Sequence, residues 1–175
     1  RQRLPFQRHL LWRPAPHRLN GARSMAKWLV KTEPDECSID DFARAPDTPV
    51  PWDGVRNYQA RNFLRQMQAG DGVFIYHSSC RHIGIAGIVE VVRAAYPDPA
   101  QFDPDSPYYD PKSPRDNPRW SAVDLRYVRT LPRLIPLVEL KTLSGLDHLA
   151  LLRKGSRLSV MPVSEAEWHI ILQQV

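Results

Sequence analysis

Three short stretches of the chain combine aromatic, charged and hydroxyl side chains at points where the chain is expected to turn. The first, Trp52–Arg61, joins a tryptophan, an Asp-Gly turn and two arginines, and the others are Lys31–Glu33 and Tyr76–Ser78. An indole in a loop offers a flat face for stacking, and a guanidinium forms strong hydrogen bonds with phosphate oxygens. These residue types therefore suit a ligand that carries both a flat ring and a phosphate.

The same residues also have structural explanations. Trp52 suits a core or lid position, and Asn57 is placed to cap the helix that follows it. Arg56 and Arg61 can pair with carboxylates at the surface, whereas Lys31–Glu33 can form a turn cluster. Residue types alone leave the binding and the structural explanations open.

Alternation along a strand separates the side chains of the third stretch. Tyr76 and Ser78 point to one face of the strand and His77 points to the other, so only one of these sets can face a pocket. We expect Tyr76 and Ser78 to face it, because a lone histidine at a strand end is more often structural.

The elements before the third stretch are predicted from their punctuation. Lys27–Lys31 forms a strand that ends at Glu33-Pro34, because proline cannot continue a central ladder. Ser38–Phe42 opens a short helix with a capping box. Asn57 caps a second helix, whose apolar stripe runs from Ala60 to Met67. One strand end and one helix start thus present two of the candidate stretches.

A curved sheet is predicted for the middle of the chain. Strands over residues 73–78 and 83–92 have strong β character, and the second is interrupted by Gly84 and Gly87. Glycine inside a strand marks a bulge, a barrel corner or the close approach of another backbone. Residues 96–119 are rich in proline and are predicted to form a long surface loop.

The C-terminal part adds further short elements. We expect a strand over 120–130, short helices over 137–143 and 147–154, a strand over 157–162 and a final helix with its capping box at Ser164–Glu167. Trp28 and Trp168 are assigned to the core, since each lies among aliphatic residues. Five or six strands with short helices predict an α+β domain whose sheet curls into a small, partly open barrel.

Composition limits the class of protein. The chain has 175 residues, of which 42% are hydrophobic and 25% charged, as expected for one folded domain. Its apolar runs are too short for a membrane span. Cys37 and Cys80 form no Cys-x-x-Cys pair, and His82, His148 and His169 lack the spacing of metal ligands. We expect an intracellular, cytoplasmic protein without a metal or a cofactor.

The formal net charge of +5 is unevenly distributed. Residues 1–24 hold six of the 24 basic residues and no acid, which leaves 18 basic against 19 acidic residues from Met25 onward. We expect residues 1–24 to be a floppy basic leader or a start-site extension, with a phosphate-binding arm and an organelle-targeting segment as alternatives. Any nucleic-acid surface of the body must therefore come from local clustering of charge.

The sequence resembles the EVE domain over essentially all of residues 25–175. The long block Trp52–Asn62 (WDGVRNYQARN) carries most of the resemblance, together with Lys27–Asp35 (KWLVKTEPD), Tyr76–Ser78 and Arg157–Val160 (RLSV). One departure is Thr32, where the family more often has serine. EVE domains belong to the PUA-like group and are similar to the YTH readers of methylated adenine in RNA.

The resemblance implies a PUA-like pseudobarrel of about five or six mostly antiparallel strands that flips a modified nucleobase into an aromatic pocket. The base usually attached to the family is 5-methyl- or 5-hydroxymethylcytosine in DNA, with RNA as the alternative polymer. Arg56 and Arg61 are the candidates for phosphate contact, and His77 and Trp120 are secondary candidates. The candidates for base contact are Lys31, Thr32, Glu33, Trp52, Gly54, Val55, Asn57, Tyr58, Tyr76 and Ser78.

Two other functions compete with this one. The related ASCH group includes amidohydrolases that act on modified cytidine, which draws attention to Lys31, Thr32 and Glu33 as a catalytic set. However, no nucleophile stands with a base and an orienting group, and Cys80 beside Arg81 is a weak signal. A third hypothesis is an adaptor with no nucleic-acid role that holds a protein partner with the 96–119 loop. We expect a binding protein rather than an enzyme.

Overall fold

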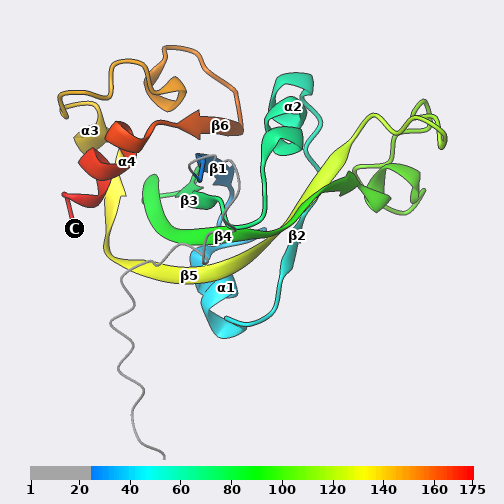
Figure 1. Cartoon of the computed structure of the whole chain (residues 1–175), viewed down its shortest axis with the longest axis horizontal. Coiled ribbons are helices and arrows are strands. Elements are labelled where there is room, and N and C mark those ends of the chain that lie inside the picture. The colour runs from blue at the N-terminus through cyan, green and yellow to red at the C-terminus, as the bar shows by residue number, and fades with distance from the viewer. Residues whose placement is uncertain (1–24) are drawn as a thin grey trace, which may run out of the picture.

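The computed structural model describes residues 25–175, so the predicted leader lies outside the described residues. Six strands form one sheet in the order β2-β5-β4-β3-β1-β6, with short helices packed around it (Figure 1). Of the strand pairs, β1–β3 is parallel and the others are antiparallel. This arrangement confirms the predicted α+β class. The strands are β1 (Lys27–Thr32), β2 (Val50–Trp52), β3 (Gly72–His77), β4 (Gly84–Pro97), β5 (Ser121–Pro136) and β6 (Val160–Val163).

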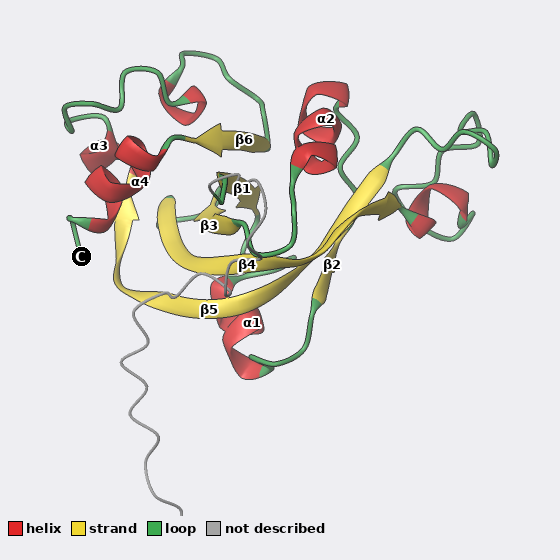
Figure 2. Ribbon diagram, viewed as in Figure 1, coloured by secondary structure: helices red, strands yellow, loops and turns green. Residues whose placement is uncertain are grey.

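The sheet curls because its two longest strands bend together. In Figure 2, β4 and β5 run side by side as long curved strands, and their register shifts at several points. Two glycines of β4 permit close approach: a Cβ on Gly84 would collide with the carbonyl oxygen of Ile135, and one on Gly87 would collide with Ile39. The close approach predicted for these glycines is confirmed.

The helices α1 (Ile39–Arg44) and α2 (Tyr58–Gln66) both pack against the sheet and share one hydrophobic cluster (Figure 1). Both begin as predicted. Ser38 and Asp41 form the capping box of α1, and the Asn57 side chain accepts a 2.9 Å hydrogen bond from the Ala60 N–H at the start of α2. Since α2 starts at this cap, the residues just before it are held in a fixed loop.

Two of the three predicted C-terminal helices are shorter than the sequence predicts. α3 (Leu137–Leu140) ends early, because the Thr142 hydroxyl bonds to the Glu139 carbonyl and the chain turns. In place of the helix predicted over 147–154 there is a single 3₁₀ turn, Ala150–Leu152, closed by i to i+3 hydrogen bonds. The final helix, α4 (Glu165–Leu172), has the predicted capping box.

Strand boundaries also depart from the predictions. β5 continues to Pro136, β6 begins only at Val160, and the edge strand β2 was not predicted. The segment 96–119 is not simply a surface loop: β4 extends to Pro97 and a 3₁₀ turn covers Pro99–Phe102. Three polar residues of this segment, Asp98, Gln101 and Ser113, are buried. Their burial means that the segment packs as part of the domain.

Two hydrophobic clusters cover the two faces of the sheet. One packs α1 and α2 against the sheet and contains Trp28, and the other packs α3 and α4 and contains Trp168. The two indoles are 3% and 2% exposed, so their predicted core positions are confirmed. The Trp28 N–H donates a buried 2.9 Å hydrogen bond to the Asp71 carboxylate, which satisfies both polar groups. Among residues 25–175, no helix is long and apolar enough to cross a membrane.

Replacing Gly84 by alanine should destabilise the fold, because the new Cβ meets the backbone of β5 and backbone cannot rotate away. We expect Gly84→Ala to lower the free energy of unfolding by about 1 to 3 kcal/mol. Urea unfolding followed by circular dichroism measures the change. The matched control is Ala94→Ser on the exposed part of the same strand, which should stay within about 0.5 kcal/mol. Equal midpoints for the two variants would contradict the close approach.

Candidate functional site

A cleft of about 860 Å³ opens where several segments meet at the end of β1. Its volume falls within the range of small-molecule pockets, about 300 to 1,000 Å³. The walls come from the end of β1, the turn before α1, β2 with the loop that follows it, the end of β3, one residue of segment 96–119 and the approach to β6. The lining residues are Lys31, Thr32, Glu33, Glu36, Cys37, Val50, Pro51, Trp52, Asp53, Gly54, Val55, Arg56, Asn57, Ser78, Tyr108, Arg157 and Ser159.

The back wall of the cleft is held together by backbone hydrogen bonds at the end of β1. The Lys31 N–H donates to the Ser159 carbonyl at 2.9 Å, and the Ser78 N–H donates to the Thr32 carbonyl at 2.9 Å. These bonds bring segments that are far apart in sequence to one strand end. The side chains that follow, including the exposed Glu33, project from a rigid base.

The sequence suggested that Trp52 lies in a loop, but it lies at the end of strand β2. It pairs with Val123 of β5, is only 9% exposed, and stacks on Phe42 with ring centroids 6.2 Å apart. The indole therefore belongs to the core and also presents part of its surface to the cleft. Both explanations of Trp52, structural and ligand-facing, hold for one side chain.

The side chain of Tyr108 reaches the cleft because Gly54 leaves room for it. A Cβ on Gly54 would lie 2.7 Å from Cε2 of Tyr108, and Gly54 has a φ of +77°, a conformation that favours glycine. The half-buried phenol thus packs directly on the loop backbone. Burial, followed by the charges of Glu36 and Asp53, raises the pKa of Tyr108. Tyr108 is therefore a second aromatic wall, close to the acidic side of the cleft.

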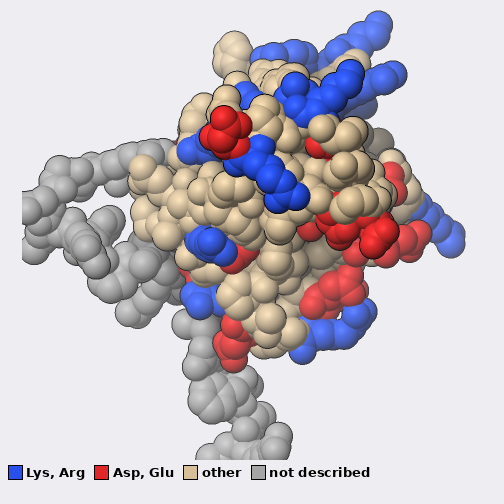
Figure 3. Space-filling view, turned by 90° about the vertical axis from the view of Figure 1, so that its right-hand side faces the viewer, with Lys and Arg blue, Asp and Glu red and all other residues tan. Residues whose placement is uncertain are grey.

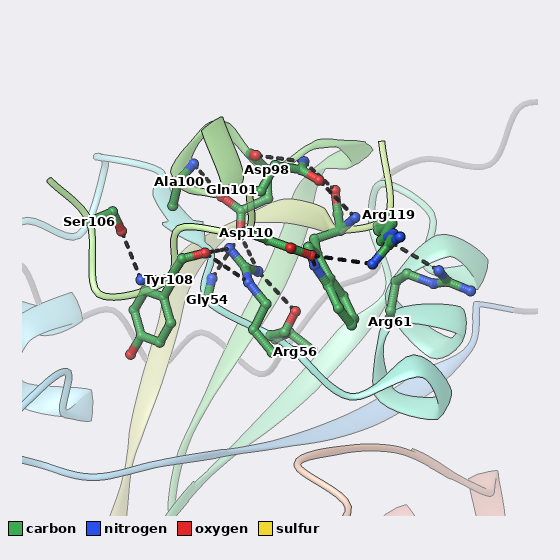
Figure 4. Close-up of polar contacts among 12 residues, drawn as sticks. Gly54, Arg56, Arg61, Asp98, Ala100, Gln101, Ser106, Tyr108, Asp110 and Arg119 are labelled. Carbon is green, nitrogen blue, oxygen red and sulfur yellow. Dashed lines mark hydrogen bonds and ion pairs between the residues drawn. The ribbon is translucent and has the colours of Figure 1, made fainter. Parts of the chain in front are cut away.

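The loop after β2 is fixed by a fully buried carboxylate, that of Asp98 (Figure 4). It accepts hydrogen bonds from the Gly54 N–H at 2.9 Å, from Nη1 of Arg56 at 2.9 Å and from the Ala100 N–H at 2.8 Å. Arg56 also donates to the Tyr108 carbonyl from Nε and Nη2, at 3.1 and 2.8 Å. One ion pair thus ties the loop and Tyr108 together.

This pairing corrects the phosphate role expected of Arg56. Its guanidinium has a carboxylate partner and two bonds to a backbone carbonyl, although the residue lines the cleft. Arg61, by contrast, lies outside the cleft, and it bonds to Asn62 and to the Arg119 carbonyl. The structure gives Arg56 a positioning role in the cleft wall.

Charged groups of both signs face the cleft. Burial lowers the pKa of Lys31, whereas burial followed by the charge of Asp98 raises the pKa of Asp53. Burial, reinforced by Asp41, raises the pKa of Cys37 to about 11, so its thiol is protonated at neutral pH. The Thr32 hydroxyl donates to the carbonyls of Cys37 and Glu33. A protonated thiol and an engaged hydroxyl are poorly suited to nucleophilic attack.

The cleft brings together most of the residues that the sequence singled out. Five predicted residues do not line it, each for a visible reason. Tyr76 is 3% exposed within the core beneath α3 and α4, so its predicted place in the pocket wall is wrong. Tyr58 is 53% exposed and stacks on Trp120, with both rings outside the cleft. The residues that do line it are Lys31, Thr32, Glu33, Trp52, Gly54, Val55, Arg56, Asn57 and Ser78.

His77 and Ser78 show why strand alternation misplaced Tyr76. β3 ends at His77, so the two-residue alternation does not extend to Ser78. Within the strand Tyr76 obeys this alternation and lies with Phe74 in the cluster beneath α3 and α4. His77 Nε2 accepts a 3.1 Å hydrogen bond from the Ile39 N–H, which caps the start of α1. Burial lowers the pKa of His77 against the opposing charges of Asp40 and Asp41. Its role is structural.

The prediction missed eight lining residues and the buried Asp98. Asp53, Arg157 and Ser159 stand inside the motifs that the sequence analysis used, so their positions carried a usable signal. Tyr108 carried none, because it lies among prolines in a segment without periodicity. The other missed residues are Glu36, Cys37, Val50 and Pro51. Within residues 25–175, no group of histidine, cysteine and acidic side chains could hold a metal ion.

Comparison with known proteins identifies the class. A model of the EVE domain matches residues 26–174. The chain therefore belongs to the EVE domain family. Human thymocyte nuclear protein 1 is 44% identical over 162 residues, which cover 83% of this chain and 72% of the human protein. The chain thus shares the greater part of that protein's length.

Solved structures match the fold as well as the sequence. A crystal structure of a Pseudomonas putida protein has a TM-score of 0.82 at 55% identity, covering 85% of this chain and 98% of that one. Human THYN1 protein, crystallised in complex with DNA containing 5-methylcytosine, has a TM-score of 0.80 at 43% identity, covering 85% of this chain and 96% of that one. The predicted family and α+β fold are confirmed.

Removing the charge of Asp98 should loosen the cleft wall. Asp98→Asn keeps the shape of the side chain but leaves the half-buried Arg56 without its counter-ion, so we expect about 2 to 3 kcal/mol less stability in urea unfolding. The Gly54 amide should also lose protection from hydrogen exchange. Asp105→Asn, an exposed aspartate of the same segment, is the control. Equal stability and equal Gly54 protection in the two variants would remove Asp98 from this role.

The raised pKa of Cys37 predicts slow alkylation. At pH 8 the thiolate fraction of a group with a pKa of about 11 is over 100-fold below that of an ordinary thiol with a pKa of about 8.5. We therefore expect iodoacetamide to react slowly with Cys37 in the folded protein and the rate to rise about tenfold per pH unit up to about pH 10. Peptide mapping by mass spectrometry measures the rate, with the urea-unfolded chain as control. A rate that levels off near pH 8 would contradict burial of the thiol.

Proposed function

We propose that the protein binds DNA that contains a modified cytosine, 5-methylcytosine in the first instance, by accepting the everted base in the cleft beside Trp52 and Tyr108. The observation that carries the proposal is the open cleft of about 860 Å³ with aromatic walls and a polar end. The related human THYN1 protein, crystallised with DNA containing 5-methylcytosine, supports the choice of ligand. A base stacked in a duplex cannot enter a cleft, so entry requires eversion.

The polar groups of the cleft suit the hydrogen-bonding edge of cytosine. That edge offers an amino donor and two acceptors, the ring nitrogen N3 and the carbonyl oxygen. The carboxylates of Glu33 and Glu36 can accept from the amino group, and the Lys31 ammonium can donate to an acceptor. Thr32 is not expected to contact the base through its hydroxyl proton, because that proton is bonded within the chain.

Simple energetics set the expected selectivity. Stacking on an aromatic side chain contributes about 1 to 3 kcal/mol, which roughly offsets the few kcal/mol needed to unstack a base. The 5-methyl group adds about 0.8 kcal/mol of apolar burial, or about fourfold in affinity. Modified DNA should therefore be preferred, but by less than about tenfold. Most of the affinity must come from contacts outside the cleft.

Tyr108 offers a cleaner test of the pocket than Trp52. Because Trp52 is a core residue, Trp52→Ala should cost about 3 to 5 kcal/mol of stability and would confound a binding assay. Tyr108→Ala removes a half-buried wall and retains the carbonyl that Arg56 contacts. We expect its affinity for a methylated duplex to fall about tenfold, with Tyr108→Phe near the unaltered protein. Fluorescence anisotropy against matched methylated and unmethylated duplexes measures both affinity and preference.

The neighbouring Tyr109 is the matched control, since it is 42% exposed and does not line the cleft. Tyr109→Ala should retain full affinity. Base eversion is followed in the same titration with 2-aminopurine next to the modified cytosine, whose fluorescence should rise as stacking is lost. Equal affinity of the unaltered protein for methylated and unmethylated duplexes would overturn the proposed function, and unchanged 2-aminopurine fluorescence would overturn eversion alone.

A further inference from the structure

The helix α2 carries two positive charges on one face and no negative charge to balance them. Its sequence, Tyr58–Gln66, contains Arg61 and Arg65 but no acidic residue. Arginines four residues apart lie on the same helix face, and like charges at that spacing are destabilising. Since residues 25–175 as a whole are nearly neutral, this pair is a local concentration of charge.

The partners of these arginines orient them without neutralising them. Arg61 donates to the Asn62 side-chain oxygen at 3.1 and 2.8 Å and to the Arg119 carbonyl at 3.0 Å. Arg65 donates to the Ser121 hydroxyl at 3.0 Å and to the carbonyls of Pro118 and Arg119 at 3.2 and 3.3 Å. In the described part of the chain, neither guanidinium has a carboxylate within ion-pair distance.

Arg119 adds a third charge at the same place. Its backbone carbonyl receives bonds from both helix arginines, and its own guanidinium stands 3.9 Å from a single carboxylate, that of Asp110. Burial and then the charge of Arg61 lower the pKa of Arg65, as expected of cations held close together. We call Arg61, Arg65 and Arg119 the arginine surface. Figure 3 shows Lys and Arg side chains gathered along the upper edge of the face that it displays.

A continuous row of stacked side chains joins the arginine surface to the cleft. From the cleft wall, the Arg56 guanidinium lies 5.6 Å from the Tyr108 ring centroid and 5.5 Å from that of Trp120. Trp120 stacks on Tyr58 at 4.9 Å, and the Arg61 guanidinium lies 4.7 Å from the Tyr58 ring. Because each member contacts the next, the arginines are held at a fixed position relative to the cleft.

We propose that the arginine surface binds the phosphates of the DNA strand next to the base that enters the cleft. Guanidinium groups match phosphate oxygens in geometry, and an anion would relieve the repulsion between Arg61 and Arg65. The position of the contacted phosphates rests on the proposed function, whereas phosphate binding itself does not. The surface supplies affinity for any DNA sequence, and the cleft supplies the preference for the modified base.

The test is a salt titration of the double variant Arg61→Gln/Arg65→Gln with methylated and unmethylated duplexes. Plots of log affinity against log salt between about 50 and 200 mM should become shallower by about 2, one for each lost phosphate contact. Affinity at about 0.1 M salt should fall 10- to 100-fold for both duplexes. The ratio between methylated and unmethylated affinity should change by less than about twofold, because the cleft is untouched.

Two controls separate charge from structure. Arg61→Lys/Arg65→Lys retains the charges and should retain most of the salt dependence, whereas a merely structural role would be lost in both double variants. Arg44→Gln removes one charge from the exposed end of α1 and should leave the salt slope unchanged.

Two results would overturn the proposal. One is an unchanged slope for the glutamine double variant, with thermal unfolding showing that it is folded. The other is an equal loss of slope in the lysine and glutamine double variants, which would assign both arginines a structural role. If the protein shows no preference for methylated DNA but the slope still falls, the proposed function fails and the arginine surface stands.

Discussion

A fully buried carboxylate, that of Asp98, determines how the cleft wall is built. A buried charge is tolerated only when it is paired and hydrogen-bonded, and here one guanidinium and two backbone N–H groups meet that requirement. Two of those donors, Arg56 and Gly54, belong to the loop between β2 and α2. If the loop moved away, the buried carboxylate of Asp98 would lose its counter-ion and a backbone hydrogen bond. The free-energy cost of that loss holds the cleft wall in place.

The same constraint explains why a proline-rich segment is ordered. Asp98 and Gln101 are both 0% exposed, and the Gln101 side chain bonds to the Asp98 and Trp120 carbonyls, to the Ser113 hydroxyl and to the Trp120 N–H. The segment is thus packed around two polar side chains whose bonds are satisfied internally. Its order places Tyr108 over Gly54, where the phenol becomes a wall of the cleft.

Sequence reasoning succeeded where the determinants are local. The caps at Ser38, Asn57 and Ser164 and the glycines of β4 each depend on a few neighbouring residues, and the structure has them as predicted. It failed where the position of a side chain depends on residues far away in the sequence. The partner of Arg56 is 42 positions away, and Tyr76 is buried by residues of α3 and α4, which lie far along the chain from β3. The motif Trp52–Asn62 predicted a segment that lines the cleft. Only the packing shows that Trp52 is a core residue, that Gly54 forms a turn and that Arg56 forms an ion pair.

The division of labour between the cleft and the arginine surface follows from magnitudes. A methyl group contributes about 0.8 kcal/mol at most to selectivity, and stacking is largely spent on unstacking the base. The release of counterions from a few contacted phosphates can contribute far more to affinity, but this contribution does not depend on the DNA sequence. Under the proposed function, the arginine surface supplies affinity for any DNA sequence and the cleft supplies the preference for the modified base. The row from Tyr108 through Arg56, Trp120 and Tyr58 to Arg61 holds the cleft and the arginine surface at a fixed relative position.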